Sequence, residues 1–298
     1  MAEPQAPLKT YRGNCHCAAF VYEITLPEIK QVSECNCSVC YKKAALWAFP
    51  APADVKFVKG DPSALANYNF GKGQFTHKFC PTCGVSLMVV GHLSPPKEGE
   101  DKLPENGVNV RTLQHGQVDI AKVARKVFDG DALPPAYVAP KFTGTEPPAE
   151  IEGGQLYTGS CHCGAVTFAV KSKPINKDLE GVVECNCSIC GKYGAPWAYP
   201  LHAEISIQGR ENLGEYFFGQ RISGKKFCKT CGVPLFSEQP RLDDERVARL
   251  SEESRAWYER GQAVKAVNLR AVNGLNVKGV NTIQMDGYNI IKPGYVEP

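Results

Sequence analysis

Short segments rich in β-branched and aromatic residues recur along the chain, and glycine or proline separates them at short intervals. Residues of these types suit the pleated, half-buried surface of a β-strand. The pattern predicts strands within residues 18–24, 55–60, 84–90, 108–113, 165–170 and 204–209. We therefore expect an antiparallel β fold with few helices.

One segment, residues 239–261, follows a different pattern. Leu242, Val247, Leu250 and Trp257 are spaced to form an apolar stripe on one or two short helices, and Ser251 is a candidate N-cap. At the corresponding place in the first half of the chain, residues 94–107 are polar and rich in proline and glycine, which predicts a loop.

The second half of the chain repeats the first. Residues 34–50, ECNCSVCYKKAALWAFP, correspond to residues 184–200, ECNCSICGKYGAPWAYP. Residues 78–87 and 226–235 also match, as do VFDG at 127–130 and QMDG at 284–287. A period of about 150 residues is too long for a solenoid, so it predicts two tandem domains, residues 1–140 and 155–298, joined by a linker at residues 141–154.

Composition places the chain among ordinary globular proteins, because 43% of its 298 residues are hydrophobic and 22% are charged. Residues 1–140 carry 15 basic against 13 acidic side chains and residues 141–298 carry 19 against 18, so no nucleic-acid partner is expected. The lysines of YKK at 41–43 and GKK at 224–226 are interpreted as solvated surface. No apolar run reaches the roughly 20 residues of a membrane span, and no secretory signal is recognisable, so we expect a cytoplasmic protein with an untargeted, disordered N-terminal tail.

The fourteen cysteines carry the candidate chemistry. Each repeat contains a CxC, then a CxCxxC, then a CxxC. Disulfides are rare in a reducing compartment and CxC is poor disulfide geometry, so metal binding is favoured over a disulfide framework, an iron–sulfur cluster or buried free thiols. Gly84 and Gly232 would let each CxxC turn double back. Seven cysteines divide into four and three, which would give one closed structural zinc site and one open site per repeat. Spacing alone leaves open which elements share a metal.

The order of these motifs resembles the glutathione-dependent formaldehyde-activating enzyme family, also called the centromere protein V-like family. The resemblance occurs twice, from Tyr11 to Pro140 and from Tyr157 to Pro298. It implies a β-tent fold of twisted antiparallel sheets with about two zinc ions per domain. It also implies that the first CxC and the CxxC form closed sites, Cys15, Cys17, Cys80, Cys83 and Cys161, Cys163, Cys228, Cys231. The open, functional sites would then be Cys35, Cys37, Cys40 and Cys185, Cys187, Cys190.

The type activity of that family joins glutathione to formaldehyde, and the reverse reaction cuts a carbon–sulfur bond. The resemblance therefore implies a zinc-dependent carbon–sulfur lyase whose partner is a small-molecule adduct of glutathione or another thiol. A metal-bound thiol is deprotonated, and the thiolate is the nucleophile. Arg111 and Arg270 are predicted either to grip a glutathione carboxylate or to form structural salt bridges. A zinc-stabilised binding module and a thiol-based redox or metal sensor are the alternative functions.

Several other repeated residues admit two interpretations. His16 and His162 either support the structural zinc by packing or take part in catalysis, whereas His77, His92, His115 and His202 are predicted at the surface. Asn36 and Asn186 either orient the open-site cysteines or are turn residues. Trp47 with Phe49, and Trp197 with Tyr199, either wall a pocket or pack in the core. The two copies also differ, since Ala18 stands where the second repeat has Gly164.

Overall fold

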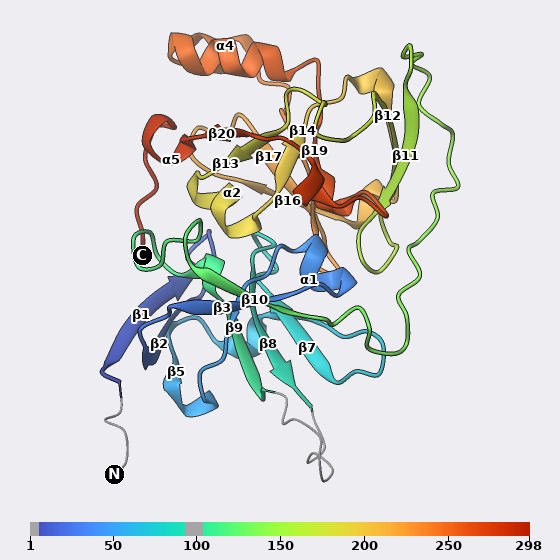
Figure 1. Cartoon of the computed structure of the whole chain (residues 1–298). Coiled ribbons are helices and arrows are strands. Elements are labelled where there is room, and N and C mark those ends of the chain that lie inside the picture. Colours follow the sequence, from blue (N-terminus) through green and yellow to red (C-terminus); the bar gives the residue numbers. More distant parts are fainter. Residues whose placement is uncertain (1–5, 93–103) are drawn as a thin grey trace. The chain divides into compact units, whose positions relative to one another are not determined.

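The computed structural model describes residues 6–92 and 104–298. The chain divides into two compact units, one built mainly from residues before 138 and the other mainly from residues 138–295 (Figure 1). Each unit contains one three-stranded and one seven-stranded sheet. Within the described residues, no helix is long and apolar enough to cross a membrane.

In the first unit, β1 (Leu8–Asn14), β2 (Val21–Pro27) and β5 (Val55–Lys59) form the three-stranded antiparallel sheet. The seven-stranded sheet has the order β10-β3-β4-β9-β8-β7-β6. Its strands are β3 (Gln31–Cys35), β4 (Trp47–Ala48), β6 (Ala66–Tyr68), β7 (Phe75–Phe79), β8 (Ser86–Gly91), β9 (Asn106–Asn109) and β10 (Ala124–Phe128). One short α-helix, α1 (Ser38–Lys42), and 3-10 turns at Pro52–Asp54, Pro62–Ala64 and Val110–Thr112 complete the described elements.

The second unit repeats this topology strand for strand. Its three-stranded sheet contains β11 (Gln155–Ser160), β12 (Thr167–Ser172) and β15 (Ile205–Gln208). Its seven-stranded sheet has the order β16-β17-β18-β19-β14-β13-β20, with strands β16 (Leu213–Phe217), β17 (Gly224–Cys228), β18 (Pro234–Glu238), β19 (Ala266–Asn268), β14 (Pro196–Ala198), β13 (Val183–Cys185) and β20 (Ile283–Met285). The α-helices are α2 (Ser188–Tyr193), α3 (Asp244–Ala248), α4 (Glu252–Gly261) and α5 (Gly287–Ile290). The 3-10 turns lie at His202–Glu204, Arg210–Asn212, Leu269–Ala271 and Val277–Gly279.

The mainly β fold with few helices is confirmed, but the large sheets are mixed. β10 pairs with β3 in parallel, and β20 pairs with β13 in parallel. The expectation of antiparallel pairing is therefore wrong for one strand pair in each unit. A parallel pair needs a long crossover connection. Here the crossover places the last strand of each unit, β10 or β20, beside the strand that ends at the first cysteine of the CxCxxC motif, β3 or β13.

The predicted strands are found except at residues 108–113. There β9 ends at Asn109, whose side chain accepts a hydrogen bond from the backbone N–H of Arg111 and so starts a 3-10 turn. The predicted helices are α3 and α4, and Ser251 caps α4 by accepting from the N–H of Ser254. The predicted apolar stripe is only partly correct, because Trp257 is 40% exposed and Tyr258 is the buried residue of α4. Residues 1–5 of the predicted N-terminal tail and most of the predicted loop at 94–107 lie outside the described residues. The expectation of a disordered tail over residues 1–10 is wrong at its end, because β1 already begins at Leu8.

The strands pack because their alternate side chains enter a core, as Tyr22 and Ile24 of β2 do. The Tyr22 hydroxyl is buried and hydrogen-bonded to the Thr112 hydroxyl, and burial raises the pKa of Tyr22. The second repeat has Phe168 and Ala271 at these two positions. Both members of the polar pair are therefore replaced together, which avoids leaving one buried hydroxyl without its partner.

We predict that Gly13→Ala and Gly159→Ala each destabilise the protein by about 1–3 kcal/mol, because a new methyl group would overlap the rings of Tyr22 and Phe168 respectively. Gly279→Ala is the control, since nothing lies within 4 Å of the position its methyl group would take. Denaturant unfolding measures the three differences. Equal stability of all three variants would contradict this account of the close approach.

Candidate metal centres

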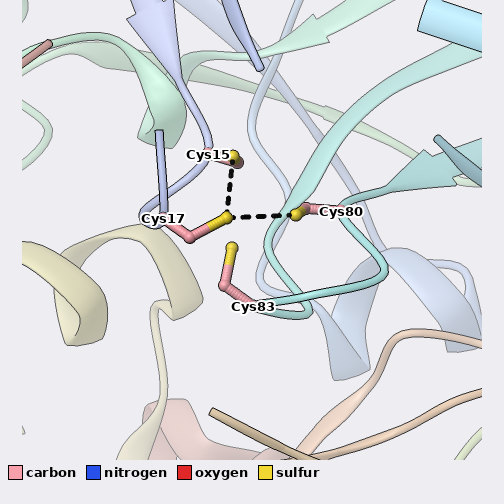
Figure 2. A group of neighbouring side chains, drawn as sticks. All are labelled: Cys15, Cys17, Cys80 and Cys83. Carbon is pink, nitrogen blue, oxygen red and sulfur yellow. Dashed lines mark hydrogen bonds between the residues drawn. The ribbon is translucent and has the colours of Figure 1, made fainter. Parts of the chain in front are cut away.

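The first CxC and the CxxC of the first repeat meet in one cluster. The Sγ atoms of Cys15, Cys17, Cys80 and Cys83 all lie within 4.8 Å of one another. Cys17 Sγ is 3.5 Å from Cys15 Sγ and 3.5 Å from Cys80 Sγ (Figure 2). Cys15, Cys80 and Cys83 are fully buried, and Cys17 is half-buried.

The second repeat builds the same cluster. The Sγ atoms of Cys161, Cys163, Cys228 and Cys231 lie within 4.8 Å of one another, and Cys163 Sγ is 3.5 and 3.6 Å from its neighbours Cys161 and Cys228. All cysteines are free thiols, as such separations require, because a disulfide bond is about 2.05 Å long. Four sulfurs around one zinc at about 2.3 Å would be about 3.8 Å apart, close to what is seen.

Local turns place these thiols. The chain reverses after β1, where the N–H of Phe20 donates to Cys15 Sγ at 3.3 Å, and the N–H of Val166 donates equally to Cys161 Sγ. Gly84 and Gly232 follow the CxxC pairs with φ of 69° and 71°, as the sequence predicted. The difference between Ala18 and Gly164 falls at a left-handed position in both repeats, with φ of 58° and 82°. The alanine is therefore the strained version of this turn.

The middle motif forms a separate cluster of three thiols. Cys35 ends β3, Cys37 is the N-cap of α1 and Cys40 lies within α1, and their Sγ atoms are within 4.8 Å of one another. Cys185, Cys187 and Cys190 form the equivalent cluster between β13 and α2. The structure thus brings all fourteen predicted ligands into the two groups of four and two groups of three that the family resemblance implied.

Crowding makes the three thiols ionise unequally. Hydrogen bonds from Cys37 and Cys40, with the N–H groups of Cys37 and Gly130, lower the pKa of Cys35 to about 3. The hydrogen bond between Cys37 and Cys35 raises the pKa of Cys37 to about 12. The pKa of Cys40 is raised well above its usual value, first by its hydrogen bond to Cys35. In the second cluster the pKa of Cys190 is lowered and that of Cys187 is raised. A divalent cation would allow all three to be thiolates at once, so the donor set fits a metal.

The repeated Asp-Gly pair closes over each cluster of three thiols. Asn36 Nδ2 donates to Asp129 Oδ1 at 2.8 Å, and Asn186 Nδ2 donates to Asp286 Oδ1 at 2.8 Å. A methyl group on the next residue, Gly130, would overlap Cys35 Sγ. Gly287 stands in the same relation to Cys185. Each asparagine therefore connects the CxCxxC motif to the segment that follows the last strand of the unit. The role of the two glycines was not predicted from the sequence, although the matching segments VFDG and QMDG contain them.

Arg111 and Arg270 each form a hydrogen bond to the end of the helix that carries the three-thiol site. Arg111 Nε donates to the carbonyl oxygen of Ala44 at 2.7 Å, and Arg270 Nε donates to that of Gly194 at 2.9 Å. Ala44 and Gly194 adopt φ of 49° and 57° at the ends of α1 and α2. Arg111 is not among the residues that line the cavity described next, so the geometry does not favour its predicted contact with a substrate carboxylate.

A cavity of about 760 Å³ opens onto the first three-thiol cluster, with Cys35, Cys37 and Cys40 in its wall. Trp47 and Phe49 line it, which favours the predicted pocket in the first repeat. Trp47 is buried and its Nε1 donates to Cys40 Sγ at 3.4 Å, whereas Phe49 is 44% exposed. His77 also lines the cavity and is buried, so its predicted place at the surface is wrong; the rings of Trp47 and Phe70 lie beside it.

The expectation of solvated lysines is also wrong at three positions, because Lys42, Lys43 and Lys225 are buried. Lys225 occupies the place of His77 in the second repeat. Its Nζ lies 4.8 Å from the centre of the Trp197 ring and donates to Ser237 Oγ at 3.1 Å. Its charge also helps to lower the pKa of Cys190.

Other predicted residues keep a supporting role. His16 and His162, between the cysteines of each first CxC, are buried, which favours packing over catalysis. Trp197 is buried, and Tyr199 is 43% exposed. Although the residue as a whole is 43% exposed, desolvation of its hydroxyl, followed by the charges of the three nearby thiols, raises the pKa of Tyr199, so this hydroxyl belongs to the second three-thiol site.

The chain is similar in sequence to known proteins. A model of the family described as glutathione-dependent formaldehyde-activating enzyme matches residues 10–103 and 156–256. A Halomonas elongata protein, provisionally named for that same activity, is 33% identical over 98 residues, which are 29% of this chain and 58% of that protein. The chain therefore spans little more than half the length of this relative. A Rhodobacter sphaeroides protein of known structure is 25% identical over 43% of this chain and 98% of its own, with a TM-score of 0.32.

We predict that the two kinds of cluster respond differently to loss of one ligand. Cys80→Ser or Cys228→Ser should unfold or aggregate its unit, because metal binding at a buried four-thiol site contributes to folding directly. Cys37→Ser or Cys187→Ser should lose about one bound metal ion of about four per chain and melt within a few degrees of the wild type. Elemental analysis and thermal melts provide the measurements. Equal melting of both kinds of variant would refute the division.

We also predict that Gly130→Ala weakens metal retention at the first three-thiol cluster alone, because the methyl group would displace Cys35 Sγ. Loss of about one metal ion under a mild chelator, with unchanged thermal stability, is the expected result. Gly191→Ala is the matched control, since the nearest atom to its new methyl group would be 3.7 Å away. Full retention by Gly130→Ala would show that the glycine does not position the thiols.

Proposed function

Because the chain belongs to the glutathione-dependent formaldehyde-activating enzyme family, we propose that it is a zinc-dependent carbon–sulfur lyase. Its substrate would be the adduct of glutathione, or of another small thiol, with an aldehyde or other electrophile. The observation that carries the proposal is the cluster of Cys35, Cys37 and Cys40 in the wall of a cavity of about 760 Å³. A buried metal site of purely structural purpose needs no such cavity.

Zinc fits both kinds of cluster. An all-thiolate donor set suits zinc, and four ligands close a tetrahedral site whereas three leave one position for a substrate. We assign the four-thiol groups to structural zinc and the three-thiol groups to functional zinc, four ions per chain when all sites are filled. Bound at a three-thiol group, zinc would lower the pKa of an entering thiol, which generates the nucleophilic thiolate near neutral pH.

Positive charge at the cavity suits an anionic thiol. Lys30, Lys72 and Lys126 line the cavity and are exposed, and the acidic side chain of Glu28 lies 3.5 Å from Lys30. Glutathione carries two carboxylates, so these lysines are better placed to receive them than Arg111 is. Exposed ammonium groups attract an anion without fixing its geometry, which would be fixed by the sulfur instead.

The remaining residues position the reacting groups. Trp47 Nε1 and the hydrogen bond between Asn36 and Asp129 hold the cysteines in place. In the cleavage direction the adduct hydroxyl loses its proton, the carbonyl double bond forms, and the electrons of the carbon–sulfur bond return to sulfur. We assign the proton exchange to His77, because it lines the cavity and an imidazole nitrogen can donate or accept a proton.

We predict that the wild type binds glutathione at least about tenfold more tightly than S-methylglutathione, because a thioether cannot lose a proton to become a strong metal ligand. Cys37→Ser/Cys187→Ser should lose this preference while retaining weak binding through the lysines. Calorimetry of both ligands with both proteins gives the comparison. Equal affinity in all four combinations would reject the lyase in favour of a zinc-stabilised binding module.

A further inference from the structure

The cavity of the first repeat is much more apolar than a formaldehyde adduct requires. Besides the three thiols, its walls include Phe49, Phe70, Phe75, Val89 and Phe128. Its volume of about 760 Å³ lies in the range of about 300–1,000 Å³ that holds whole drug-sized ligands. Glutathione is a polar tripeptide, and a hydroxymethyl group adds only one carbon and one oxygen to it. Such a ligand offers few apolar atoms to the apolar part of the wall.

The aromatic groups are packed into a continuous surface near the thiols. The ring of His77 lies 6.1 Å from that of Trp47 and 5.8 Å from that of Phe70, and Phe70 stacks on Tyr68 at 6.1 Å. Trp47 also contacts Cys40 through its Nε1. An apolar group attached to the sulfur atom at the three-thiol site would therefore meet these rings directly.

The second repeat forms the same three-thiol cluster with a less apolar set of neighbouring residues. On adjacent strands of the first repeat, His77 of β7 faces Val89 of β8. The same cross-strand pair in the second repeat is Lys225 and Ser237, joined by a hydrogen bond of 3.1 Å. Ser223 stands where the first repeat has Phe75. The stacked pair Tyr68–Phe70 recurs as Tyr216–Phe218, so what is particular to the first repeat is the apolar character at Phe75 and Val89.

We propose that the three-thiol site of the first repeat acts on thiol adducts whose electrophile is a bulky apolar aldehyde, aromatic or long-chain. This substrate class rests on the proposed lyase function. In the synthetic direction the thiolate sulfur adds to the carbonyl carbon, and the carbonyl electron pair moves to oxygen, which takes up one proton. The reverse step returns the aldehyde and the thiol, and neither direction requires an oxidant or reductant.

Two thioethers of glutathione test the cavity separately from the thiol chemistry. S-hexylglutathione and S-methylglutathione present the same kind of sulfur and the same carboxylates, and differ only in apolar length. We expect S-hexylglutathione to bind the wild type at least about tenfold more tightly by calorimetry, because its extra methylene groups leave water for the apolar wall. A ratio near one would overturn the substrate class.

Matched variants locate the effect. Phe49→Ala should lower the hexyl-to-methyl affinity ratio at least about threefold, and since Phe49 is 44% exposed the variant should fold. Val89→Ser, which introduces the residue of the second repeat, should lower the ratio as well. Tyr199→Ala, the change in the second repeat that corresponds to Phe49→Ala, should leave the ratio unaltered. An unchanged ratio in both first-repeat variants, or an equal fall in Tyr199→Ala, would overturn the assignment to the first repeat.

The same experiments separate this inference from the function on which it rests. If glutathione binding depends on Cys37 and Cys187 but the ratio of the two thioethers is near one, the lyase proposal stands and the bulky apolar substrate is rejected. If the ratio is large but the affinity for glutathione is the same in the wild type and in Cys37→Ser/Cys187→Ser, the cavity is an apolar binding site without thiol chemistry. That second result overturns both proposals.

Discussion

Four thiols crowded within 4.8 Å join the two sheets of each unit. Cys15 and Cys17 follow β1 of the three-stranded sheet, whereas Cys80 and Cys83 follow β7 of the seven-stranded sheet. Ionised sulfurs at such distances repel one another unless a cation lies among them, and a cation that binds them ties the sheets together. The three-thiol cluster depends on this junction, because Cys35 ends a strand of the same seven-stranded sheet.

Residue type and spacing predicted the strands and the two repeats, whereas the grouping of the cysteines into particular sites came from the family resemblance, because spacing alone left it open. Features that depend on long-range pairing were not predictable in the same way. Arg111 and Asn109 matched in both repeats, but only the structure shows that the arginine binds the end of α1 and that the asparagine begins a 3-10 turn. Burial of Lys225 and His77 was missed because a cross-strand neighbour, not the local sequence, decides whether a polar side chain is covered.

The two repeats have diverged unevenly. The tryptophan beside the three thiols, the arginine behind the helix and the asparagine–aspartate bond are the same in both, because each of them holds a cysteine or its helix in place. Residues that face the space in front of the thiols differ, with Phe49 and Val89 in one repeat and Tyr199 and Ser237 in the other. Positions that support the thiol clusters are thus retained while positions that would meet a ligand vary, which is the pattern expected when one scaffold holds two specificities.

The parallel pairing of β10 with β3 also orders events in time. Phe128 lies opposite Cys35, and Asn36 waits for a partner, Asp129, that is 93 residues further along the chain. The four-thiol group, by contrast, is complete once Cys83 has been added. During synthesis the ribosome therefore delivers all four thiols of this group well before the segment that covers the three thiols. The four thiols could gather around a metal ion, if they bind one, while the three-thiol cluster is still open to the solvent, so the three thiols are covered last.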